Sequence, residues 1–370
     1  MRRLRSLVGL FIIIIFASWY LISTLTKQTI NVVTEIKPLK INRSSSSEKI
    51  ILHIGERQNA LFNSLLFDSC EYSNCKFYQT EDIGSAFQGD VLIFSSGSNR
   101  LSQEVDALIR QRQIWLMYSL ESPAYSHNKW DSYINGFNGS ITYLQDSFPG
   151  SLPYGIKVPK SNSTARTVVD YAKGKTKGAF AYVSNCQSVG YDRLGTMKEL
   201  GKYINVDIFG DCTKNSPCPG KASVSCEAKL HAGYKFYLAF ENSMCKEYMT
   251  EKFWRSLYST GGYVPVVVGG LSVDDYTRHA PPNSFIHAYN FSSVAQLGRY
   301  LKQLMADDKA FNRYHEWRQH YDITLYTSTK ALPCKLCEAA HKPEATFRNH
   351  QNKRLVEDWN DASKCRTKVF

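Results

Sequence analysis

The chain has 370 residues, of which 43% are hydrophobic and 13% aromatic. This is long enough for two domains and apolar enough for sizeable cores, which excludes a wholly disordered or fibrous protein. The 45 basic and 33 acidic residues give a formal charge of +12, which suits an anionic partner such as an anionic lipid or a phosphorylated small molecule. Because the basic residues are scattered and form no dense stripe, a nucleic acid partner is not expected.

The first strong signal in chain order is an uncharged, apolar segment at Leu7–Leu25. As a helix it would span ~28 Å, close to the hydrocarbon thickness of a bilayer. Arg2, Arg3 and Arg5 precede it, so the positive-inside rule keeps a tail of residues 1–6 in the cytosol and places the rest in a lumen. The alternative is a cleaved signal peptide, which is disfavoured because the apolar run is long for one. The sequence therefore predicts a single-pass signal-anchor at residues 7–25.

Residues 26–48 are polar and include a serine run at Ser44–Ser47, which predicts a flexible stem. A cytosolic tail, one span, a stem and a luminal globule are typical of type II membrane proteins of the Golgi, although type II receptors share this layout. Ten cysteines and four N-glycosylation sequons favour an oxidising lumen. The sequons are at Asn42, Asn138, Asn162 and Asn290.

From residue 49 onward, short apolar runs alternate with helical patterns. The expected strands are 50–54, 91–94, 114–118, 180–183, 206–209, 236–240 and 264–268, and the expected helices are 103–113, 192–203, 248–260 and 294–320. This alternation predicts an α/β fold with parallel sheets and right-handed crossovers. Gly, Pro, Ser and Asn are frequent between residues 128 and 165, so we expect the junction of two halves near residues 153–163.

Polar residues follow several of these strands, where ligands bind in open parallel sheets. Arg193 and Lys252 fall in the first turns of predicted helices, where a cation opposes the helix dipole and an anion such as a diphosphate would relieve the conflict. Glu251 could accept hydrogen bonds from a ribose diol, and Glu121 could be a general base. Taken alone, each has a plainer interpretation: a surface charge for the two cations, and a first-turn or turn acid for the two carboxylates.

The segment 234–270, YKFYLAFENSMCKEYMTEKFWRSLYSTGGYVPVVVGG, closely resembles the signature of the α1,3-fucosyltransferases. Further motifs agree: LESP at 120–123, FNGSITY at 137–143, PYG at 153–155, VSNC at 183–186, PNSFIHA at 282–288 and C-x-x-C at 334–337. The resemblance covers roughly residues 49–341.

The resemblance implies a GT-B fold with two facing Rossmann-like domains, an acceptor-side domain at residues 49–158 and a GDP-fucose-binding domain at 159–345, followed by a tail at 346–370. It implies an inverting transfer of L-fucose in which Glu121 is the catalytic base. The implied donor-binding residues are Ser184, Asn185, Arg193, Glu241, Asn242, Tyr248, Glu251 and Lys252.

The implied acceptor is the 3-hydroxyl of N-acetylglucosamine in a glycoprotein or glycolipid glycan, and the implied location is the Golgi membrane. Core chitobiose, LacNAc and LacdiNAc remain open as acceptors. Residues 143–148, YLQDSF, depart from the basic YRRDSD-like run that is frequent in the family, which leaves acceptor preference undecided. The alternatives are a related transferase with another linkage or donor, or a catalytically inactive glycan-binding protein. A homodimer is left open.

An obligatory metal is not expected, because two cations can stabilise a departing diphosphate, although a divalent ion could stimulate the reaction. The acidic pairs at 274–275 and 307–308 are interpreted as loop or surface acids. A zinc or redox role for Cys334 and Cys337 is disfavoured, because no second close pair of thiols at zinc spacing accompanies them.

The resemblance instead implies that this pair bonds to Cys70 and Cys75, with the connectivity open. Three further cysteines, at Cys212, Cys218 and Cys226, are expected to form a local disulfide loop.

Overall fold

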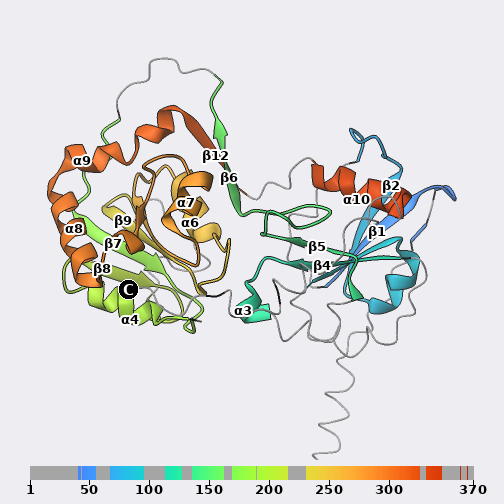
Figure 1. The fold of residues 1–370 in the computed structure, drawn as a ribbon, viewed down its shortest axis with the longest axis horizontal. Helices are drawn as coiled ribbons and strands as arrows, with labels where there is room; N and C mark the ends of the chain where they lie inside the picture. The colour runs from blue at the N-terminus through green and yellow to red at the C-terminus, as the bar shows by residue number, and fades with distance from the viewer. Residues whose placement is uncertain are drawn as a thin grey trace, which may run out of the picture. The chain divides into compact units, whose positions relative to one another are not determined.

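The computed structural model describes residues 41–42, 44–55, 67–95, 113–126, 136–161, 169–188, 190–215, 231–325, 331–343, 359 and 365. The first sheet contains five parallel strands in the order β2-β1-β3-β4-β5 (Figure 1). Its strands are β1 (Lys49–Ile54), β2 (Cys75–Thr80), β3 (Val91–Ser95), β4 (Ile114–Ser119) and β5 (Gly139–Thr142). The central strands are mostly apolar and buried, as expected where both faces of a parallel sheet are covered.

Helix α10 (Ala331–His341) packs against β1 and β3, although it lies near the C-terminal end of the chain (Figure 1). Its Leu332 and Leu336 are buried in one core with Ile51 and Leu116 of the sheet. The range 159–345 that was expected to form the second domain therefore includes a helix that packs on the first sheet. Two shorter helices complete this half, the 3-10 helix η1 (Ile83–Gln88) and α3 (Pro123–Ser126).

The second sheet also contains five parallel strands, in the order β11-β10-β9-β7-β8. Its strands are β7 (Lys177–Tyr182), β8 (Val206–Phe209), β9 (Tyr234–Phe240), β10 (Val264–Val268) and β11 (Ile286–His287). Its helices are α4 (Arg193–Leu200), α6 (Glu251–Tyr258), α7 (Val273–His279), α8 (Val294–Ala306) and α9 (Asp308–Arg313), with 3-10 helices η5 (Ala288–Asn290) and η6 (Glu316–Gln319).

Alternate side chains of β7 enter different cores, as the two-residue period of a strand requires. Ala179 and Ala181 pack with the apolar faces of α4 and α8. Phe180 packs in an aromatic cluster on the opposite face, with Phe209, Tyr234 and Tyr263. The second sheet therefore has an aliphatic face under helices and an aromatic face.

The two sheets share one topology. When the strands of each half are numbered from its own first strand, both orders become 2-1-3-4-5, a doubly wound arrangement. In such a sheet the order in which strands are added reverses beside the first strand, and a crevice opens there beyond the strand ends. The second half has this switch point between β7 and β9, and the first half has it between β1 and β3.

The two halves are also joined by a small antiparallel sheet of β6 (Gly155–Pro159) and β12 (Tyr321–Leu325). β6 lies within the junction that the sequence predicts near residues 153–163. Both strands contact α6. Because β12 is followed by α10, the chain crosses the junction once through β6 and returns through β12, and residues from Asn42 onward form one compact unit.

Every predicted strand is present, with ends shifted by a few residues, but the predicted helix 294–320 is wrong as a single element. Asp307 ends α8 and begins α9, because its side chain accepts a hydrogen bond from the backbone N–H of Ala310 as an N-cap. Most of the predicted helix 103–113 lies outside the described residues. So does the predicted span 7–25, and within the described ranges no helix is long and apolar enough to cross a membrane.

Four disulfides join described cysteines: Cys70–Cys334, Cys75–Cys337, Cys186–Cys212 and Cys245–Cys365. The first two attach α10 to the first sheet through the partners that the family resemblance implied. Cys212 bonds to Cys186, which corrects the expectation of a local loop; Cys218 and Cys226 lie outside the described residues.

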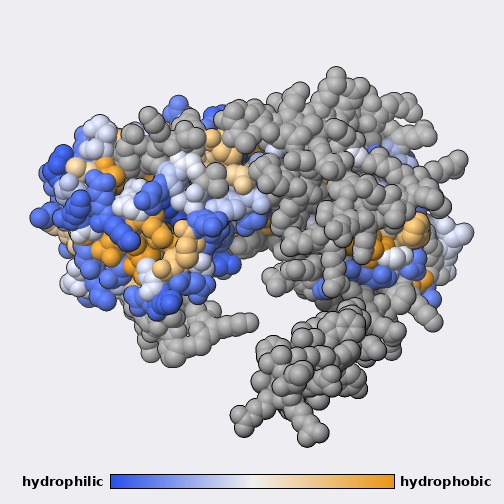
Figure 2. Space-filling view, turned by 90° about the horizontal axis from the view of Figure 1, so that it is seen from below, coloured by the Kyte–Doolittle hydropathy of each residue, from blue (hydrophilic) through white to orange (hydrophobic). Residues whose placement is uncertain are grey.

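Figure 2 shows that the described surface of one face is largely hydrophilic with smaller hydrophobic areas, as expected when both cores are buried.

Candidate functional site

A cavity of about 810 Å³ opens beyond the carboxyl ends of the second sheet's strands. This volume is within the range of small-molecule sites. Seven of the nine catalytic and donor-binding residues expected from the sequence line it: Glu121, Ser184, Asn185, Arg193, Asn242, Glu251 and Lys252. We call it the donor cavity below.

The topology explains why these residues meet. Ser184 and Asn185 follow β7, and Asn242 follows β9, the two strands that flank the switch point. Glu251 and Lys252 begin α6, the helix that follows β9. Residues far apart in the sequence therefore converge at one sheet edge, where a doubly wound fold leaves room for a ligand.

Arg193 is the first residue of α4 and is only 2% exposed. Its Nη2 donates to the backbone carbonyl of Asn185, and its Nη1 donates to that of Phe240 at 3.4 Å. Its Nε is buried and has no hydrogen-bond partner among the described residues. The guanidinium is thus fixed between the two strand ends.

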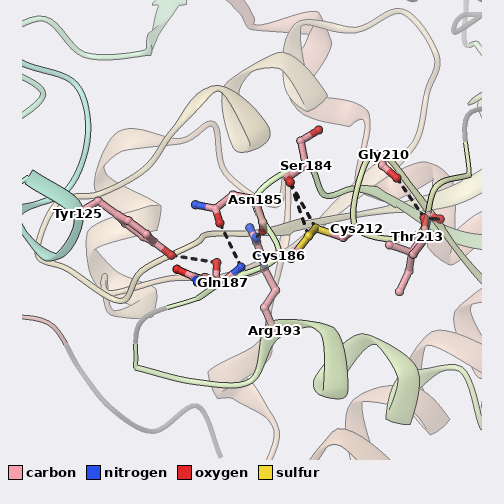
Figure 3. Close-up of a disulfide and its surroundings, with 10 residues drawn as sticks. Tyr125, Ser184, Asn185, Cys186, Gln187, Arg193, Gly210, Cys212 and Thr213 are labelled. Carbon is pink, nitrogen blue, oxygen red and sulfur yellow. Dashed lines mark hydrogen bonds between the residues drawn. A yellow bond between two sulfur atoms is a disulfide. The ribbon is translucent and has the colours of Figure 1, made fainter. Parts of the chain in front are cut away.

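The loop that carries Ser184 and Asn185 is held from two sides (Figure 3). The Cys186–Cys212 disulfide ties it to the segment after β8. On the other side, the hydroxyl of Tyr125 in α3 donates to the carbonyl of Gln187 at 2.9 Å. These contacts fix the backbone of the loop, including the carbonyl that accepts from Arg193.

Lys252 is the centre of a partly buried charge cluster. Its Nζ lies 3.0 Å from Oε1 of Glu251 and 3.4 Å from Oε2 of Glu241, and it donates to the Oγ1 of Thr250 at 3.1 Å. Burial alone would lower the pKa of Lys252, but the carboxylates of Glu241 and Glu251 outweigh it and raise that pKa. Lys252 is therefore a cation at neutral pH.

The two carboxylates of the cluster differ. Burial raises the pKa of Glu241, against the opposing effect of Lys252. Burial also acts to raise the pKa of Glu251, but there the neighbouring ammonium of Lys252 prevails and the pKa is lowered. Glu251 reaches the cavity as an ionised acceptor, as a group that binds a diol would need to be.

Two of the expected donor-binding residues, Glu241 and Tyr248, do not line the donor cavity. Glu241 is 0% exposed, and its oxygens accept from the backbone N–H of Thr250 at 2.8 Å and from its hydroxyl at 2.7 Å. It therefore anchors the start of α6 and forms an ion pair with Lys252 on the side away from the cavity. Tyr248 is 1% exposed, and its hydroxyl donates to Oε2 of Glu121 at 3.2 Å.

Glu121 reaches the donor cavity from the first sheet, just after β4, and its side chain is exposed. The segment around it is fixed by its neighbours. Tyr154 donates to the carbonyl of Leu120 at 2.6 Å, and the hydroxyl of Ser243 donates to that of Ser122 at 2.7 Å in a buried contact. One carboxylate of the first half thus shares a cavity with the cations of the second.

Several residues of the donor cavity were not predicted from the sequence. Arg255 follows Lys252 by three positions and so falls on the same face of α6, a signal that helical spacing could have given. Six ring side chains also line the cavity: Phe180, Tyr182, His231, Tyr237, Tyr258 and Tyr263. Burial lowers the pKa of His231 to about 4, so its ring is neutral at pH 7.

Acidic residues and cysteines that were considered as metal or redox sites make structural contacts instead. Asp275 completes a capping box with Ser272 at the start of α7, and Asp308 pairs with Lys235 at 2.5 Å. Cys75, Cys337 and His341 lie close enough together to hold a metal, but the two cysteines are joined in a disulfide. Of the sequons, Asn42, Asn138 and Asn290 are exposed, and Asn162 lies outside the described residues.

Comparison with known proteins gives a consistent result. The family description "Glycosyltransferase family 10 (fucosyltransferase) C-term" matches residues 172–359, about half of the chain. Glycoprotein 3-alpha-L-fucosyltransferase A of Drosophila melanogaster is 30% identical over 308 residues, which cover 81% of this chain and 57% of the relative. Alpha-(1,3)-fucosyltransferase fut-1 of Caenorhabditis elegans is 34% identical over 262 residues, which cover 69% of this chain and 56% of the relative.

The chain therefore spans a little over half the length of these relatives. A crystal structure of an α1,3-fucosyltransferase with GDP aligns with 85% of this chain and 97% of its own, at 14% identity and a TM-score of 0.52. At that identity the alignment shows a shared fold.

Proposed function

The chain belongs to glycosyltransferase family 10, and on that premise we propose that it transfers L-fucose from GDP-β-L-fucose to the 3-hydroxyl of N-acetylglucosamine in a glycan. The observation that carries this proposal is a single cavity that is lined by Glu121, Arg193 and Lys252. A carboxylate opposite two cations suits a reaction that removes a proton at one end and releases a diphosphate at the other.

In the proposed mechanism, Glu121 accepts the proton of the acceptor hydroxyl while the hydroxyl oxygen attacks the anomeric carbon of fucose. The bond from that carbon to the β-phosphate oxygen breaks, and GDP leaves from the opposite side, so the β-linked donor gives an α-linked product. Arg193 and Lys252 stabilise the charge that develops on the departing diphosphate. Glu251 accepts hydrogen bonds from the ribose, and Asn242 lies close to the fucose.

The charge balance of the donor cavity favours an anionic ligand. Three cations line it, Arg193, Lys252 and Arg255, against two carboxylates, Glu121 and Glu251. Arg193 and Lys252 are held in place before any ligand arrives, so a diphosphate meets fixed positive groups and little reorganisation is needed. The aromatic side chains at the other end offer flat apolar surfaces to a nucleobase.

The test is a transfer assay with the full chain in detergent, labelled GDP-fucose and an array of glycans that end in core chitobiose, LacNAc or LacdiNAc. We expect label on N-acetylglucosamine and competition by GDP but not by UDP. Transfer from a different nucleotide sugar would point to a related transferase. GDP-independent retention of glycans without transfer would support the inactive glycan-binding alternative.

We also propose the finer architecture and location that the sequence suggests. The two halves are facing Rossmann-like domains of the GT-B type with boundaries at 49–158 and 159–345, except that α10 of the second range packs on the first sheet. Residues 7–25 anchor the chain in the Golgi membrane, with residues 26–48 as a stem and the catalytic part in the lumen. Protease treatment of sealed microsomes should remove an N-terminal tag and spare a C-terminal one; the reverse pattern would refute this topology.

A further inference from the structure

The segment 122–125, which begins one residue before α3, makes side-chain hydrogen bonds to two loops of the second half. The hydroxyl of Ser243, just beyond β9, donates to that of Ser122 at 2.7 Å in a buried contact. The hydroxyl of Tyr125 donates to the carbonyl of Gln187, in the loop after β7, at 2.9 Å. Because β7 and β9 flank the switch point, one short segment of the first half holds the loops that follow both of these strands.

Arg193 spans the gap between the same two strand ends. Its Nη2 donates to the carbonyl of Asn185, two residues before Gln187, and its Nη1 donates to that of Phe240, the last residue of β9, at 3.4 Å. Because Arg193 is only 2% exposed, the position of its guanidinium depends on where these two carbonyls lie. A displacement of the loop after β7 would therefore move the guanidinium as well.

The loop at residues 184–187 depends on contacts from other segments. Its residues are exposed and belong to no helix or strand, so its own backbone hydrogen bonds do not fix it. The Cys186–Cys212 disulfide supports it from the segment after β8. Tyr125 supports it from the first half, and its side chain points toward this loop from α3 (Figure 3).

The hydroxyl of Tyr125 is suited to this contact. Burial raises the pKa of the half-buried Tyr125, so the group keeps its proton and remains a donor at neutral pH. The charges of Arg193 and Lys252 lower that pKa and the charge of Glu121 raises it, so the hydroxyl lies within the field of both the cations and the proposed base. Tyr125 thus connects the segment that carries Glu121 with the loop that holds Arg193.

We propose that Tyr125 is a positioning residue for Arg193: from the first half, its hydroxyl holds the loop after β7 so that the guanidinium stays aligned with the diphosphate of the donor. This inference rests on the proposed function, because it takes a diphosphate as the ligand of Arg193. It predicts that a residue four positions from the base affects the affinity for the donor and not the affinity for the acceptor.

The test is Tyr125→Phe in the full chain, which removes only the hydroxyl. We expect Kd for GDP and KM for GDP-fucose to rise by about two- to tenfold, the range that one neutral hydrogen bond supports, while KM for the acceptor glycan is unchanged. Guanosine, which lacks the diphosphate, should bind the variant and the wild type equally. The matched control is Tyr78→Phe, a half-buried tyrosine of the edge strand β2, which should leave Kd for GDP unchanged.

A combination with Cys186→Ser/Cys212→Ser tests whether the effect passes through the loop. Two supports of one loop replace each other in part, so the loss of GDP affinity in the combined variant should exceed the product of the separate losses by about twofold or more. Losses that simply multiply would overturn the proposal, because Tyr125 and the disulfide would then act on different parts of the site.

Three further outcomes would contradict the proposal. Equal weakening of GDP and guanosine would mean a general change of the fold, and a raised KM for the acceptor at unchanged Kd for GDP would make Tyr125 an acceptor contact. Unchanged GDP affinity in Tyr125→Phe, beside a wild type that binds GDP, would overturn this inference alone. A wild type that does not bind GDP would overturn the proposed function with it.

Discussion

The carboxyl ends of the two sheets share one strand order but place their charges differently. In the second sheet, the buried Arg193 and the partly buried Lys252 cluster lie at the switch point and are held by their own half. In the first sheet, Glu121 follows β4, one strand beyond the switch point, and is exposed. The side-chain hydrogen bond that reaches it comes from the second half.

This difference follows from the two tasks that we propose. Cations that stabilise a leaving group act best when they are fixed beforehand, and burial among carboxylates and carbonyls fixes them. A base must meet a second substrate and exchange its proton, so it has to remain accessible. Substitutions at the base and substitutions at the cations should therefore have different effects, the first on transfer and the second on GDP binding.

The largest effect is expected from Glu121→Gln, which keeps the shape of the side chain and removes the base. Transfer should fall by about 10²–10⁴-fold, the usual contribution of general base catalysis, while the affinity for GDP stays the same because the cations of the second half are untouched. Steady-state kinetics and calorimetric titration with GDP measure the two effects separately. Near-normal turnover at saturating acceptor would refute the base assignment.

Lys252→Ala tests the other end and should weaken GDP binding itself. We expect GDP affinity to fall by about tenfold or more, because a buried cation that contacts a phosphate is lost. The free energy of unfolding should also fall by about 3–5 kcal/mol, because the fully buried Glu241 loses its ion-pair partner.

The double variant Glu241→Gln/Lys252→Ala separates these two losses. It removes the unpaired charge and should recover stability in a denaturant titration without recovering GDP affinity. Recovery of both would mean that Lys252 acts on GDP only through the fold.

The sequence predicted the interior of the fold well because interior parallel strands are continuous apolar runs. β1, β3, β4, β7, β9 and β10 were all predicted from such runs. The strands that it missed are β2, β5 and β11 at sheet edges, and β6 and β12 of the two-stranded sheet. Edge strands are short or half-polar, so their local pattern does not differ from that of a loop.

The residues of the site also divide into those that a local sequence pattern could predict and those that it could not. Polar residues after apolar strands could be found because chain order and sheet topology place them together, and seven of the nine expected residues line the donor cavity. The roles of Glu241 and Tyr248 could not be found, because they depend on which partner each side chain reaches across the fold. The family resemblance implied donor binding for these residues, and the structure adds the side-chain contacts that each makes, Glu241 with Thr250 and Tyr248 with Glu121.

A smaller effect is expected from removing the Cys186–Cys212 disulfide with Cys186→Ser/Cys212→Ser. The loop that fixes Arg193 loses one of its two supports and keeps the hydrogen bond from Tyr125, so GDP affinity should fall only by a few-fold, about 1 kcal/mol or less. The loss of the crosslink should lower stability by about 2–4 kcal/mol.

The matched control is Cys70→Ser/Cys334→Ser, which breaks a crosslink between α10 and the first sheet. It should lower stability without changing GDP affinity. If both variants weaken GDP equally, the loss reflects global destabilisation and not the loop beside Arg193.

The smallest effect is expected from removing divalent metal. Because Arg193 and Lys252 would already present fixed positive charge to the diphosphate, a chelator should change the wild-type rate by less than about twofold. The comparison becomes sharper in Lys252→Ala, where magnesium should restore part of the lost rate by replacing the missing charge, while Glu121→Gln should gain nothing from the metal because its defect lies at the acceptor. Complete and reversible loss of wild-type activity in the chelator would show that these side chains do not supply enough charge to release GDP on their own.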